Sequence, residues 1–480
     1  DSHSSSPPSP SAGRCSMSTL GVPSPPSPAT ALGVARWKSK STSRERRPST
    51  PGTRSRRNSA SGAGGVKVCV RFRPENALEK AEGGNYCVQH PSTDTCVVGP
   101  GNHFTFDRVF DPASSQADVY EYAAREVVES VLDGYNGTVL AYGQTSSGKT
   151  YTMEGPSIED EVHKGIVPRM VRTLLEGIAE APDTCEFVIA VSMLEIYMER
   201  IRDLLADPGT KQPASLSIHE DKSGSVYVQG LTEEWVSSEE ELFAFLKAGA
   251  RNRVTGQTRM NEGSSRSHSV VMVSVSQRDL DTGGVKKGRL CLVDLAGSEK
   301  VGKTWAKGTQ LEEAKTINKS LSALGNVINA LTSEKALASD DGDHDSPNPR
   351  SSPRVGPGAA PHVPYRDSKL TRVLQESLGG NAKTALIVTA SASSYNLEET
   401  LSSLRFGARA KKMRNKPVQN REISALEYKQ LLAEEQRKAL ALQEELEALR
   451  AAMKGGGAGM AGMAGAGGHA AGAAAERVGR

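Results

Sequence analysis

The sequence predicts an α/β fold in which a central β-sheet is covered by helices on both faces. From Val66 to about Asn420, short apolar runs alternate with amphipathic helical patterns, an order typical of this fold class. The opening run, VKVCVRFRP, alternates apolar and polar residues as a strand does, and Pro74 ends it. A glycine-rich, phosphate-binding pattern at residues 143–150 follows another strand-like run. At 480 residues, 37% hydrophobic and 24% charged, the chain can bury a large core and still carry unstructured ends.

Residues 1–65 form a basic extension rich in Ser and Pro. They hold ten Lys or Arg against two acids, which gives this segment a net charge of +8 and leaves the remainder at −5. With few aromatic residues, the segment cannot bury enough surface to offset the entropy of ordering, so we expect a disordered arm. Three roles stay open: a tether to an acidic polymer, a phosphorylation site near Arg56, Arg57 and Ser59, and a plain solvated tail. An organelle transit peptide is disfavoured, because the segment is Pro-rich and lacks an evident amphipathic helix.

The cysteines are scattered, with no pair or cluster at metal-ligand spacing. This pattern fits a reducing compartment, and we expect buried or incidental thiols rather than a disulfide framework. The cysteines are Cys15, Cys69, Cys87, Cys96, Cys185 and Cys291. No run approaches the roughly 18 consecutive apolar residues that a bilayer-spanning helix needs, so membrane insertion is not expected.

Residues 143–150, GQTSSGKT, match the phosphate-loop pattern of Gly, four residues, Gly, Lys and Thr. Gly143 and Gly148 let the backbone curl so that several N–H groups face one phosphate chain. Lys149 would neutralise β- and γ-phosphate oxygens, and the Thr150 hydroxyl would coordinate Mg²⁺. A strand-like TVLAY precedes the loop and a helix can follow it, which is the context that this motif requires. The residues between the two glycines, which complete the expected binding loop, are Gln144, Thr145, Ser146 and Ser147.

Two further segments carry chemistry that suits phosphoryl transfer. In LCLVDLAGSE, residues 290–299, Asp294 ends a short apolar strand, where a carboxylate can hold the water shell of Mg²⁺. Gly297 then permits close approach to a γ-phosphate. NEGSSRSH, residues 261–268, places hydroxyls, an arginine and a histidine in one polar loop, which can supply a metal ligand and a transition-state clamp. A loop of this composition taken alone is more often solvated surface.

The expected nucleotide is ATP rather than GTP. The Asn-Lys-x-Asp tetrad with which GTPases read guanine does not occur in the sequence, and the nearest match, residues 318–321, has leucine in place of the acid. ATP and Mg²⁺ are therefore the expected cofactors.

The segments GQTSSGKTYTMEG, NEGSSRSH, DLAGSEK and INKSLSALGNVINAL, in this order and spacing, resemble the kinesin motor domain. The resemblance covers about residues 66–420, and the stretch FGARAKKMRNKPVQN is most similar to conventional, or transport, kinesin heavy chain. It implies the kinesin motor fold of P-loop NTPases, with a central, mostly parallel eight-stranded sheet flanked by three helices on each side. NEGSSRSH corresponds to the first switch loop and DLAGSE to the second. The implied motor domain is residues 66–410, with residues 333–361 as a surface-loop insertion.

The resemblance also implies roles for residues around the phosphate loop. Arg71, Arg73 and Pro74 match the Arg-x-Arg-Pro motif that contacts adenosine. Tyr151 occupies the position of a ring that stacks on adenine.

The switch loops are implied to surround the γ-phosphate. Ser265 matches the position that binds Mg²⁺, and Ser264 matches a position near the γ-phosphate and the attacking water. Arg266 and Glu299 match a pair that closes a salt bridge between the loops when ATP is bound, leaving a water placed for in-line attack. The alternative for this pair is an ordinary surface ion pair, worth about 0 to 1 kcal/mol.

A long helical pattern from about Leu311 to Leu331 follows the second switch loop. The loop would sense the γ-phosphate, and the helix joined to it would act as a lever. In the family, this helix and the HVPYRDSKLTR loop bind tubulin. The expected contacts are Arg200, Lys300, Lys303, Lys315, Tyr365, Arg366, Lys369 and Arg372. Because the chain from Val66 onward is net acidic, binding to an acidic filament would depend on a local basic patch and weaken with salt. Each of these lysines taken alone is more often plain solvated surface.

Residues 411–420 resemble the neck linker, which in the family docks on the motor in the ATP state, and its position after the motor implies plus-end-directed movement. Residues 421–454 are expected to form a coiled-coil stalk and a homodimer. Residues seven apart in this segment are Leu432, Ala439, Leu446 and Met453, with Leu442 and Leu449 at the intervening positions. Tyr428 and Glu435 interrupt the seam earlier, so a single helix, packed on the motor or frayed, is the alternative.

The chain departs from the kinesin pattern at several places. Trp305 and Lys307 stand where the family usually has Gly and Glu, a change expected to tighten filament binding or to slow switching. The insertion is net acidic beside the tubulin-facing loop, and SGAGG before Val66 should be a poor partner strand for a docked neck linker. Residues 455–480, rich in Gly, Ala and Met, are expected to be a flexible linker or end.

The leading interpretation is a processive, ATP-driven microtubule motor in the cytoplasm, acting on the microtubule cytoskeleton. The alternative is a non-motile microtubule-binding ATPase or a depolymerase, favoured by the altered loop and the insertion but disfavoured by the neck-linker-like segment. A microtubule-binding module without catalysis is least expected, because every expected phosphate-site residue is present. No nucleic-acid partner is expected, and the sequence does not predict cargo or light chains.

Overall fold

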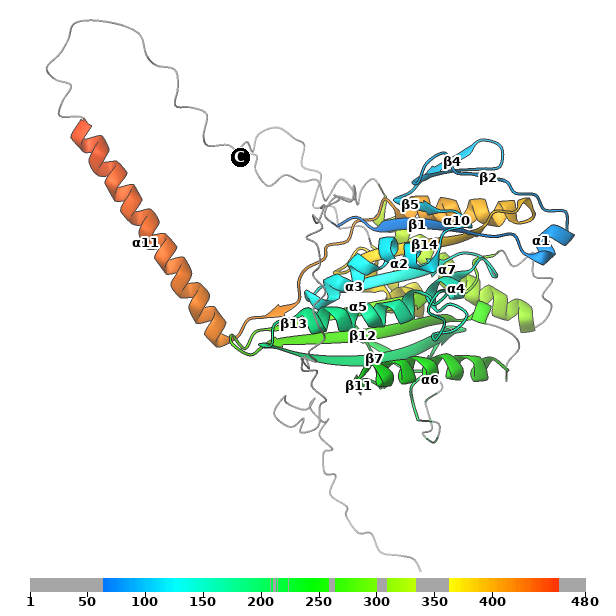
Figure 1. Cartoon of the computed structure of the whole chain (residues 1–480), viewed down its shortest axis with the longest axis horizontal. Helices are drawn as coiled ribbons and strands as arrows, with labels where there is room; N and C mark the ends of the chain where they lie inside the picture. Colours follow the sequence, from blue (N-terminus) through cyan, green and yellow to red (C-terminus); the bar gives the residue numbers. More distant parts are fainter. Residues whose placement is uncertain are drawn as a thin grey trace, which may run out of the picture. The chain divides into compact units, whose positions relative to one another are not determined.

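The computed structural model describes residues 64–207, 209, 213, 215–222, 224–258, 264–299, 309–333 and 362–456 (Figure 1). Almost all of the expected basic arm, residues 1–65, lies outside the described residues, and so do residues 334–361 of the expected insertion and 457–480 of the expected tail. Among the described helices, none combines the length and the apolar composition that a bilayer crossing needs.

The described cysteines are unpaired thiols, as the sequence predicted. Cys69 and Cys96 are buried, and burial raises the pKa of each to about 12, so both are neutral. Cys15 lies outside the described residues.

The core of the fold is a mixed β-sheet whose main path is β11-β7-β12-β13-β6-β14-β1-β5 (Figure 1). In chain order these strands are β1 (Lys67–Arg73), β5 (Arg108–Phe110), β6 (Gly137–Tyr142), β7 (Cys185–Tyr197), β11 (Glu234–Val236), β12 (His268–Asp279), β13 (Val285–Asp294) and β14 (Lys383–Ser391). The four neighbour pairs from β13 to β5 are parallel and the other three are antiparallel. The main path has the predicted eight strands, but with β8 and β15 the sheet is ten-stranded and mixed, and its parallel pairs are gathered in one half.

Shorter strands pair at the sides or form two small sheets. Strands β8 (Arg200–Asp203) and β15 (Arg421–Glu422) pair with β7 and β13, respectively. The small sheets consist of β2 (Val88–Gln89), β3 (Thr95–Val98) and β4 (Asn102–Thr105), and of β9 (Ser217–Glu220) and β10 (Val226–Gln229).

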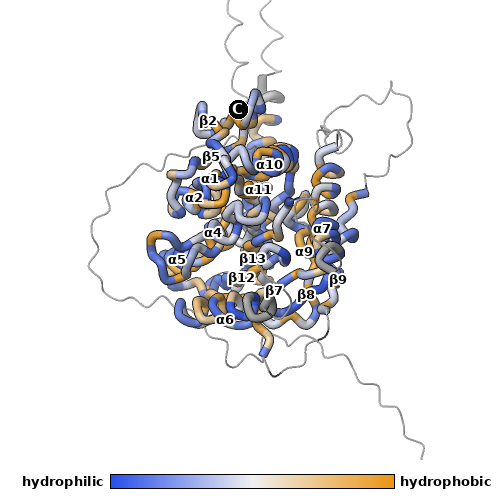
Figure 2. Tube along the Cα trace, turned by 90° about the vertical axis from the view of Figure 1, so that its right-hand side faces the viewer, coloured by the Kyte–Doolittle hydropathy of each residue, from blue (hydrophilic) through white to orange (hydrophobic). Residues whose placement is uncertain are grey.

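Helices cover both faces of the sheet, as the sequence predicted. One face carries α2 (Gln116–Ala123), α3 (Arg125–Leu132), α5 (Ile166–Glu180) and α6 (Glu239–Thr258) around one apolar core. The other carries α7 (Thr309–Leu331), α9 (Lys369–Val373) and α10 (Leu397–Ala410) around a second core. Figure 2 shows apolar and polar residues interleaved along α5 and α7, as expected of helices that bury one side. Strand β6 lies between the cores and is buried at every position, which explains its continuous apolar sequence.

The carboxyl ends of neighbouring parallel strands determine where the site lies. Asp294, the last residue of β13, pairs in register with Ala141 near the end of β6, and Val388 of β14 pairs with Tyr142. Because these strands run in the same direction, the loops that follow them leave the sheet at the same edge. The phosphate loop and the second switch loop therefore meet there, whereas Asn136, which precedes β6, lies at the opposite edge.

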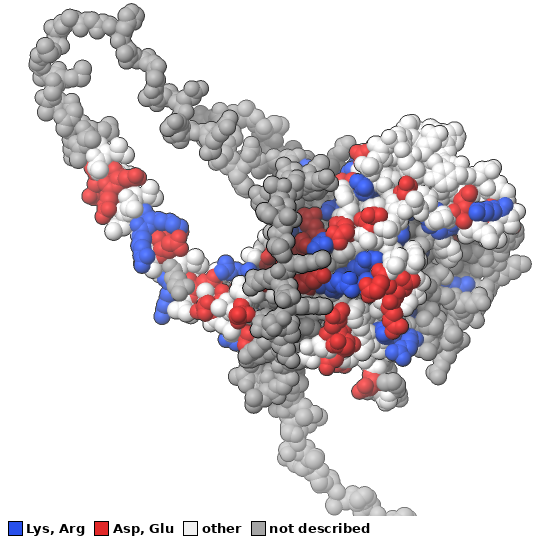
Figure 3. All heavy atoms as spheres, viewed as in Figure 1, with Lys and Arg blue, Asp and Glu red and all other residues white. Residues whose placement is uncertain are grey.

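Helix α11 (Ala425–Gly456) covers most of the expected stalk, residues 421–454. The heptad-position leucines Leu432, Leu442, Leu446 and Leu449 are between 46% and 66% exposed. Acidic and basic side chains are interspersed along the helix in Figure 3, and Lys438 pairs with two glutamates of the same helix. The segment is helical as expected, and its pairing with a second copy stays a prediction.

Candidate functional site

The phosphate loop turns tightly between β6 and the short helix α4 (Lys149–Met153). Gly143 and Gly148 have positive φ values of 155° and 100°. A Cβ atom on Gly143 would lie 2.2 Å from the carbonyl oxygen of Thr389, so only glycine fits there. Ser146, with a φ of 61°, adopts a left-handed conformation within the same loop. The backbone therefore forms the curled loop that the sequence predicted.

Lys149 lies against the inside of this loop. Its Nζ donates hydrogen bonds to the carbonyl oxygens of Gly143 at 2.9 Å and Gln144 at 2.8 Å, and the residue is 6% exposed. Burial lowers the pKa of Lys149, and the nearby carboxylates of Asp294 and Glu299 act against this shift. A desolvated cation held by neutral carbonyl groups is suited to bind phosphate oxygens, which are stronger, charged acceptors.

Thr150 and Asp294 form the candidate magnesium site. Thr150 Oγ1 donates a hydrogen bond to Asp294 Oδ2 at 2.7 Å. The other carboxylate oxygen, Asp294 Oδ1, is buried and accepts no hydrogen bond from any described residue. A buried, unsatisfied carboxylate oxygen beside a hydroxyl fits hydrated Mg²⁺, which keeps several waters and prefers oxygen ligands. The described part of the chain contains no group of three or more His, Cys, Asp or Glu that could hold a metal ion by itself.

Arg253 of helix α6 is a site residue that the sequence analysis missed. Its Nη1 donates to Asp294 Oδ2 at 2.9 Å and lies 3.4 Å from Glu154 Oε1. The side chains of Arg253 and Asp294 are each 4% exposed. Burial lowers the pKa of Arg253, but the Asp294 and Glu154 carboxylates outweigh burial, so the guanidinium is charged. No local motif marks this arginine, because its role depends on a contact between distant segments.

The residues expected to contact adenosine lie beside α4. The Arg71 guanidinium donates to Gln116 Oε1 at 2.6 Å and to Thr152 Oγ1 at 2.9 Å. It also lies 5.3 Å from the centre of the Tyr151 ring, within the range of a cation–π contact. Tyr151 is 41% exposed, so part of its ring surface is free to stack on a base.

Arg73 joins the phosphate loop to a buried carboxylate that the sequence analysis did not name. Its Nε donates to the carbonyl oxygen of Ser146 at 2.6 Å, and its Nη1 donates to that of Pro74 at 2.7 Å. Both Nη atoms also bind the carboxylate of Glu79, which is fully buried and accepts a further hydrogen bond from Ser391. Burial raises the pKa of Glu79, but the hydrogen bonds that it accepts, first of all from Arg73, lower it to about 2. Arg73 and Glu79 therefore support the phosphate loop from outside.

The two switch loops do not form the expected salt bridge between Arg266 and Glu299. Arg266, at the end of the short helix η1 (Ser264–Arg266), places its Nη1 2.9 Å from Glu313 Oε2 on α7. Glu299 instead accepts hydrogen bonds from the backbone N–H of Thr145 at 2.7 Å and from its Oγ1 at 2.6 Å. The expected pair is absent from this arrangement, because Arg266 and Glu299 each have another partner.

The switch loops nevertheless contact each other and the phosphate loop through their backbones. The N–H of Gly297 donates to the carbonyl oxygen of Ser265 at 2.8 Å. A Cβ atom on Gly297 would lie 2.2 Å from Thr145 Oγ1, so this close approach requires glycine. Ser265, and Ser264 immediately before it in η1, are thereby held next to the second switch loop.

A family model for the kinesin motor domain matches residues 71–413 of the chain. The chain belongs to the kinesin family. Kinesin heavy chains of Gibberella moniliformis and Syncephalastrum racemosum are 49% identical to it over 379 and 388 residues, which are 78% and 80% of this chain and 38% of each relative. The kinesin heavy chain of Drosophila melanogaster is 47% identical over 386 residues, 80% of this chain and 37% of the relative. The chain thus spans less than two fifths of the length of these curated relatives.

A solved structure titled "Structure of a fast kinesin: Implications for ATPase mechanism and interactions with microtubules" is also similar. Its TM-score is 0.66 and its sequence identity is 49%, over 76% of this chain and 96% of that one. The likeness therefore lies in the sequence as well as in the fold.

The residues of this kinesin that were expected to contact tubulin differ in their exposure. Arg200, at the start of β8, is exposed, and the Arg366 side chain is 80% exposed. Lys315 is paired with Glu312 at 2.7 Å, and its side chain is 55% exposed. Lys369 begins α9, which contacts α7, β9 and β10 on the same face of the molecule. The expected contacts that lie outside the described residues are Lys300 and Lys303.

Tyr365 and Arg372 make internal contacts instead. The hydroxyl of Tyr365 donates to the carbonyl oxygen of Leu378 at 2.5 Å. The Arg372 side chain is 15% exposed and is paired with Glu220 of β9. Both residues therefore stabilise α9 and the elements around it through internal contacts, and their contact with tubulin stays a prediction.

The segment that resembles the kinesin neck linker, residues 411–420, is bound along the sheet. Asn415 is 4% exposed, and its Nδ2 donates to the carbonyl oxygens of Ser377 at 3.1 Å and Ala382 at 2.7 Å, and to Thr384 Oγ1 at 2.9 Å. Because one amide group has several well-formed partners, Asn415 fixes the path of the linker at this point.

Glycines at the start of the described chain pair with the linker, against the expectation for SGAGG. Gly65 forms a β-bridge with Arg414, and the carbonyl oxygen of Gly64 accepts a hydrogen bond from the N–H of Asn415 at 2.7 Å. A Cβ atom on Gly64 would lie 2.4 Å from the Asn415 carbonyl oxygen. This close backbone pairing thus requires glycine, although glycine has no side chain with which to pack against the linker.

Asn420 attaches the end of the linker to the residue that precedes β6. Its Nδ2 donates to Asn136 Oδ1 and to the carbonyl oxygen of Lys287, both at 3.0 Å. Arg421 and Glu422 then pair with β13 as strand β15. The linker is therefore attached to β6 and β13 at the edge opposite the nucleotide site.

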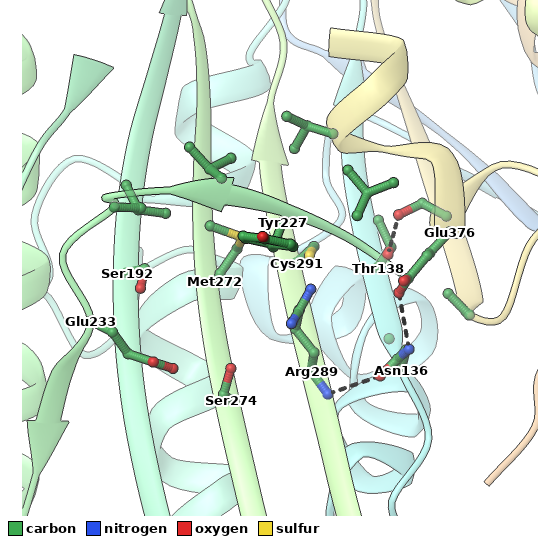
Figure 4. A pocket seen from close by; sticks show the side chains of 17 residues that line it. Asn136, Thr138, Ser192, Tyr227, Glu233, Met272, Ser274, Arg289, Cys291 and Glu376 are labelled. Atoms are coloured by element: carbon green, nitrogen blue, oxygen red, sulfur yellow. Dashed lines mark hydrogen bonds between the residues drawn. The ribbon is translucent and has the colours of Figure 1, made fainter. Parts of the chain in front are cut away.

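A cavity of about 220 Å³ lies between the face of the sheet and β10, and extends to Asn136 (Figure 4). Its lining residues, all among the described ones, come mainly from β6, β7, β10, β12 and β13 and include no member of the phosphate loop. Asn136, in its wall, donates to Glu376 Oε2 and accepts from the N–H of Arg289, each at 3.2 Å. The cavity is therefore separate from the nucleotide site and shares Asn136 with the linker attachment.

Proposed function

We propose that this kinesin is an ATP-driven motor that hydrolyses ATP to ADP and phosphate and moves along microtubules toward the plus end. The observation that carries the proposal is the arrangement around strand β6. The phosphate loop follows its carboxyl end, and Asn136 before its amino end binds Asn420 of the linker. A shift of the sheet caused by nucleotide can therefore reach the segment that leads to α11. A non-motile microtubule-binding ATPase or a depolymerase would have no need of this attachment.

ATP is assigned to the phosphate loop, with its base beside Arg71 and Tyr151. Bound Mg²⁺ would neutralise negative charge on the β- and γ-phosphate oxygens. Thr150 and Ser265 would be its protein ligands, and Asp294 would hold a coordinated water through Oδ1, which accepts no hydrogen bond from a described residue. Lys149 turns from its neutral carbonyl acceptors to the charged phosphate oxygens.

Hydrolysis requires the switch loops to exchange partners. Arg266 leaves Glu313 and pairs with Glu299, whose carboxylate leaves Thr145. This places the arginine and Ser264 around the γ-phosphate, where they orient a water for in-line attack. The exchange replaces one ion pair by another and breaks the two hydrogen bonds from Thr145 to Glu299, so ATP must bind the exchanged arrangement more tightly to drive it.

Microtubule binding is assigned to the face that carries α7, α9 and β8. Its proposed contacts are Arg200, Lys300, Lys303, Lys315, Tyr365, Arg366, Lys369 and Arg372. Because the chain beyond the basic arm is net acidic, attraction to an acidic filament comes from this local group and weakens as salt is added. The protein is accordingly proposed to act in the cytoplasm on the microtubule cytoskeleton.

A homodimer through α11 completes the proposal. Pairing two such helices would bury leucines that a single chain leaves exposed to water, and this burial favours association. No nucleic-acid partner, no membrane insertion and no particular cargo form part of the proposal.

Steady-state ATP turnover of the purified chain, with and without taxol-stabilised microtubules, tests this function. We expect strong stimulation that disappears in Arg266→Ala and falls with salt, together with plus-end-directed gliding of polarity-marked microtubules. Stimulation without gliding would favour the non-motile ATPase. Turnover that ignores microtubules would refute the coupled motor.

A further inference from the structure

His268, the first residue of β12, is hydrogen-bonded through both ring nitrogens. Its Nδ1 accepts a hydrogen bond from the N–H of Ala296 in the second switch loop at 3.0 Å. Its Nε2 lies 2.8 Å from Ser320 Oγ on helix α7. The residue is 2% exposed, and one residue, Ser267, separates it from η1 of the first switch loop. One side chain thus contacts both a switch loop and the long helix that follows it.

The directions of these hydrogen bonds fix the protonation of the ring. A backbone N–H can only donate, so the Nδ1 that accepts from Ala296 carries no proton, and the proton of the neutral ring is on Nε2. Ser320 Oγ donates its own proton to the carbonyl oxygen of Ile317 at 2.6 Å and therefore accepts from His268 Nε2. Both contacts require the same neutral tautomer. Burial, aided by the charges of Arg253 and Lys149, lowers the pKa of His268 to about 3, which keeps the ring neutral near pH 7.

Ala296 directly precedes Gly297, the residue through which the second switch loop contacts the first. The next residue, Gly297, donates its N–H to the carbonyl oxygen of Ser265, so successive N–H groups bind the first switch loop and His268. Other contacts between α7 and the switch loops use partly exposed side chains, since Arg266 is 33% exposed where it pairs with Glu313. The contact through His268 is buried from end to end, so water does not compete for its hydrogen bonds.

We propose that His268 is a positioning residue that couples the two switch loops to helix α7 through Ser320. Among the described residues, the ring makes its hydrogen bonds to Ala296 and Ser320 and none to the phosphate loop or to the candidate metal site. A displacement of the Ala296 N–H, when the γ-phosphate draws the second switch loop, moves the ring and with it the Ser320 hydroxyl. The inference rests on the proposed motor function, because it gives α7 the task of passing the nucleotide state to the filament.

Ser320→Ala removes only the α7 end of this connection, and Ser322→Ala, an exposed serine of the same helix, is the matched control. We expect basal ATP turnover of Ser320→Ala to stay within about twofold of wild type, and its microtubule-stimulated kcat to fall by about 5- to 50-fold, in the range of typical site-to-site couplings. The microtubule concentration for half-maximal stimulation should change little, because the filament-facing side chains are intact. Ser322→Ala should match the wild type in all three quantities.

His268→Asn keeps an acceptor for the Ala296 N–H but is too short to reach Ser320. It should therefore reproduce Ser320→Ala, and the double variant should be no worse than either single one, because both break the same connection. Stimulation by Ser320→Ala equal to that by Ser322→Ala would overturn the proposal. So would losses that add in the double variant, or a basal turnover that falls in parallel with the stimulated one, which would indicate a structural role. Absence of stimulation in the wild-type chain would overturn the proposed function, and this inference with it.

Discussion

Arg266 of the first switch loop is bound to Glu313 of helix α7, with 2.9 Å between Nη1 and Oε2. Tyr197 donates its hydroxyl to the other oxygen of the same carboxylate, also at 2.9 Å. The Glu313 side chain is 8% exposed, so this pair is more strongly held than an ion pair at the open surface. Glu313 is thus the partner that Arg266 must leave before it can pair with Glu299.

Replacing Glu313 by Gln should release Arg266 for Glu299. We expect ATP turnover without microtubules to rise by about threefold to tenfold, which corresponds to about 0.7 to 1.4 kcal/mol of activation free energy. Glu312→Gln, at a neighbouring carboxylate that is 70% exposed, is the control and should have no such effect. A loss of turnover like that of Arg266→Ala would mean that Glu313 supports the arginine's catalytic position instead of competing for it.

Asp294→Asn should destabilise the fold as well as weaken Mg²⁺-dependent nucleotide binding. The buried Arg253 guanidinium would lose the closer of its two carboxylate partners and keep only Glu154, and removal of one member of a buried pair typically costs about 3 to 5 kcal/mol of unfolding free energy. Urea unfolding measures this cost, and adding Arg253→Met should recover part of it by removing a buried charge that Glu154 alone compensates poorly. Equal stability of wild type and Asp294→Asn would contradict the proposed importance of the pair.

Glu79→Gln should flatten the acid side of the pH–stability profile. The pKa of Glu79 is lowered from its ordinary value of 4.5 to about 2, so the ionised carboxylate stabilises the fold fully above about pH 4.5. That contribution is lost as the pH falls through about 2. Thermal unfolding from about pH 5 to pH 2 should show a shallower loss in Glu79→Gln, which starts from lower stability, than in wild type. Glu82→Gln, at an exposed site nearby, should keep the wild-type slope.

Asn415→Ala should detach residues 411–420, the proposed neck linker, while leaving the nucleotide site intact. The change removes the hydrogen bonds that the amide makes to Ser377, Ala382, Thr384 and Gly379. We expect the gliding velocity to fall by about fivefold or more and microtubule-stimulated turnover to fall by less than about twofold, so that ATP use and movement separate. Val418→Ala, at a residue that is 60% exposed, is the control. Equal losses of velocity and turnover would place Asn415 in the hydrolysis step.

Leu442→Lys with Leu449→Lys should abolish dimerisation. Both leucines lie at intervening positions of the heptad repeat and are 65% and 66% exposed in the single chain. Sedimentation equilibrium should show a dimer for the wild type and a monomer for the double variant, because two charges cannot be buried in the seam. Leu440→Lys, at a residue 61% exposed but outside the repeat, should remain dimeric. A monomeric wild type would leave α11 as a single helix.

The phosphate loop and its neighbours were predictable because each is encoded locally. The sequence TVLAY followed by GQTSSGKT predicts a strand, a curled loop and a helix, and the structure has this order at β6, Gly143 and Lys149. Asp294 was placed correctly for the same reason, since it ends an apolar strand that runs parallel to β6.

Arg253 and Glu313 could not be assigned in this way, because each owes its role to a partner far along the chain. Glu79 was missed although its partner Arg73 is near in the sequence. The sequence from Asn76 to Glu79 has the spacing of a helix capping box, which the structure contains, but the box says nothing of Arg73. Arg253 stands in an ordinary helical pattern and gains importance only where α6 approaches β13. The Arg266–Glu313 pair was not predicted, because the motif identifies Arg266 as a functional residue but does not determine which carboxylate it binds in this arrangement.

The order of attachments along residues 414–424 has a mechanical consequence. Tension that arrives through α11 first reaches Ser424, which binds the carbonyl oxygen of Thr282, and then Glu422, Asn420 and Asn415 in turn. A backward pull would peel these attachments one after another, so the load at any moment rests on a few hydrogen bonds. A pull along the strand axis would load them together and meet a higher rupture force. The linker of this kinesin should therefore yield more easily to a rearward load than to one directed along β13.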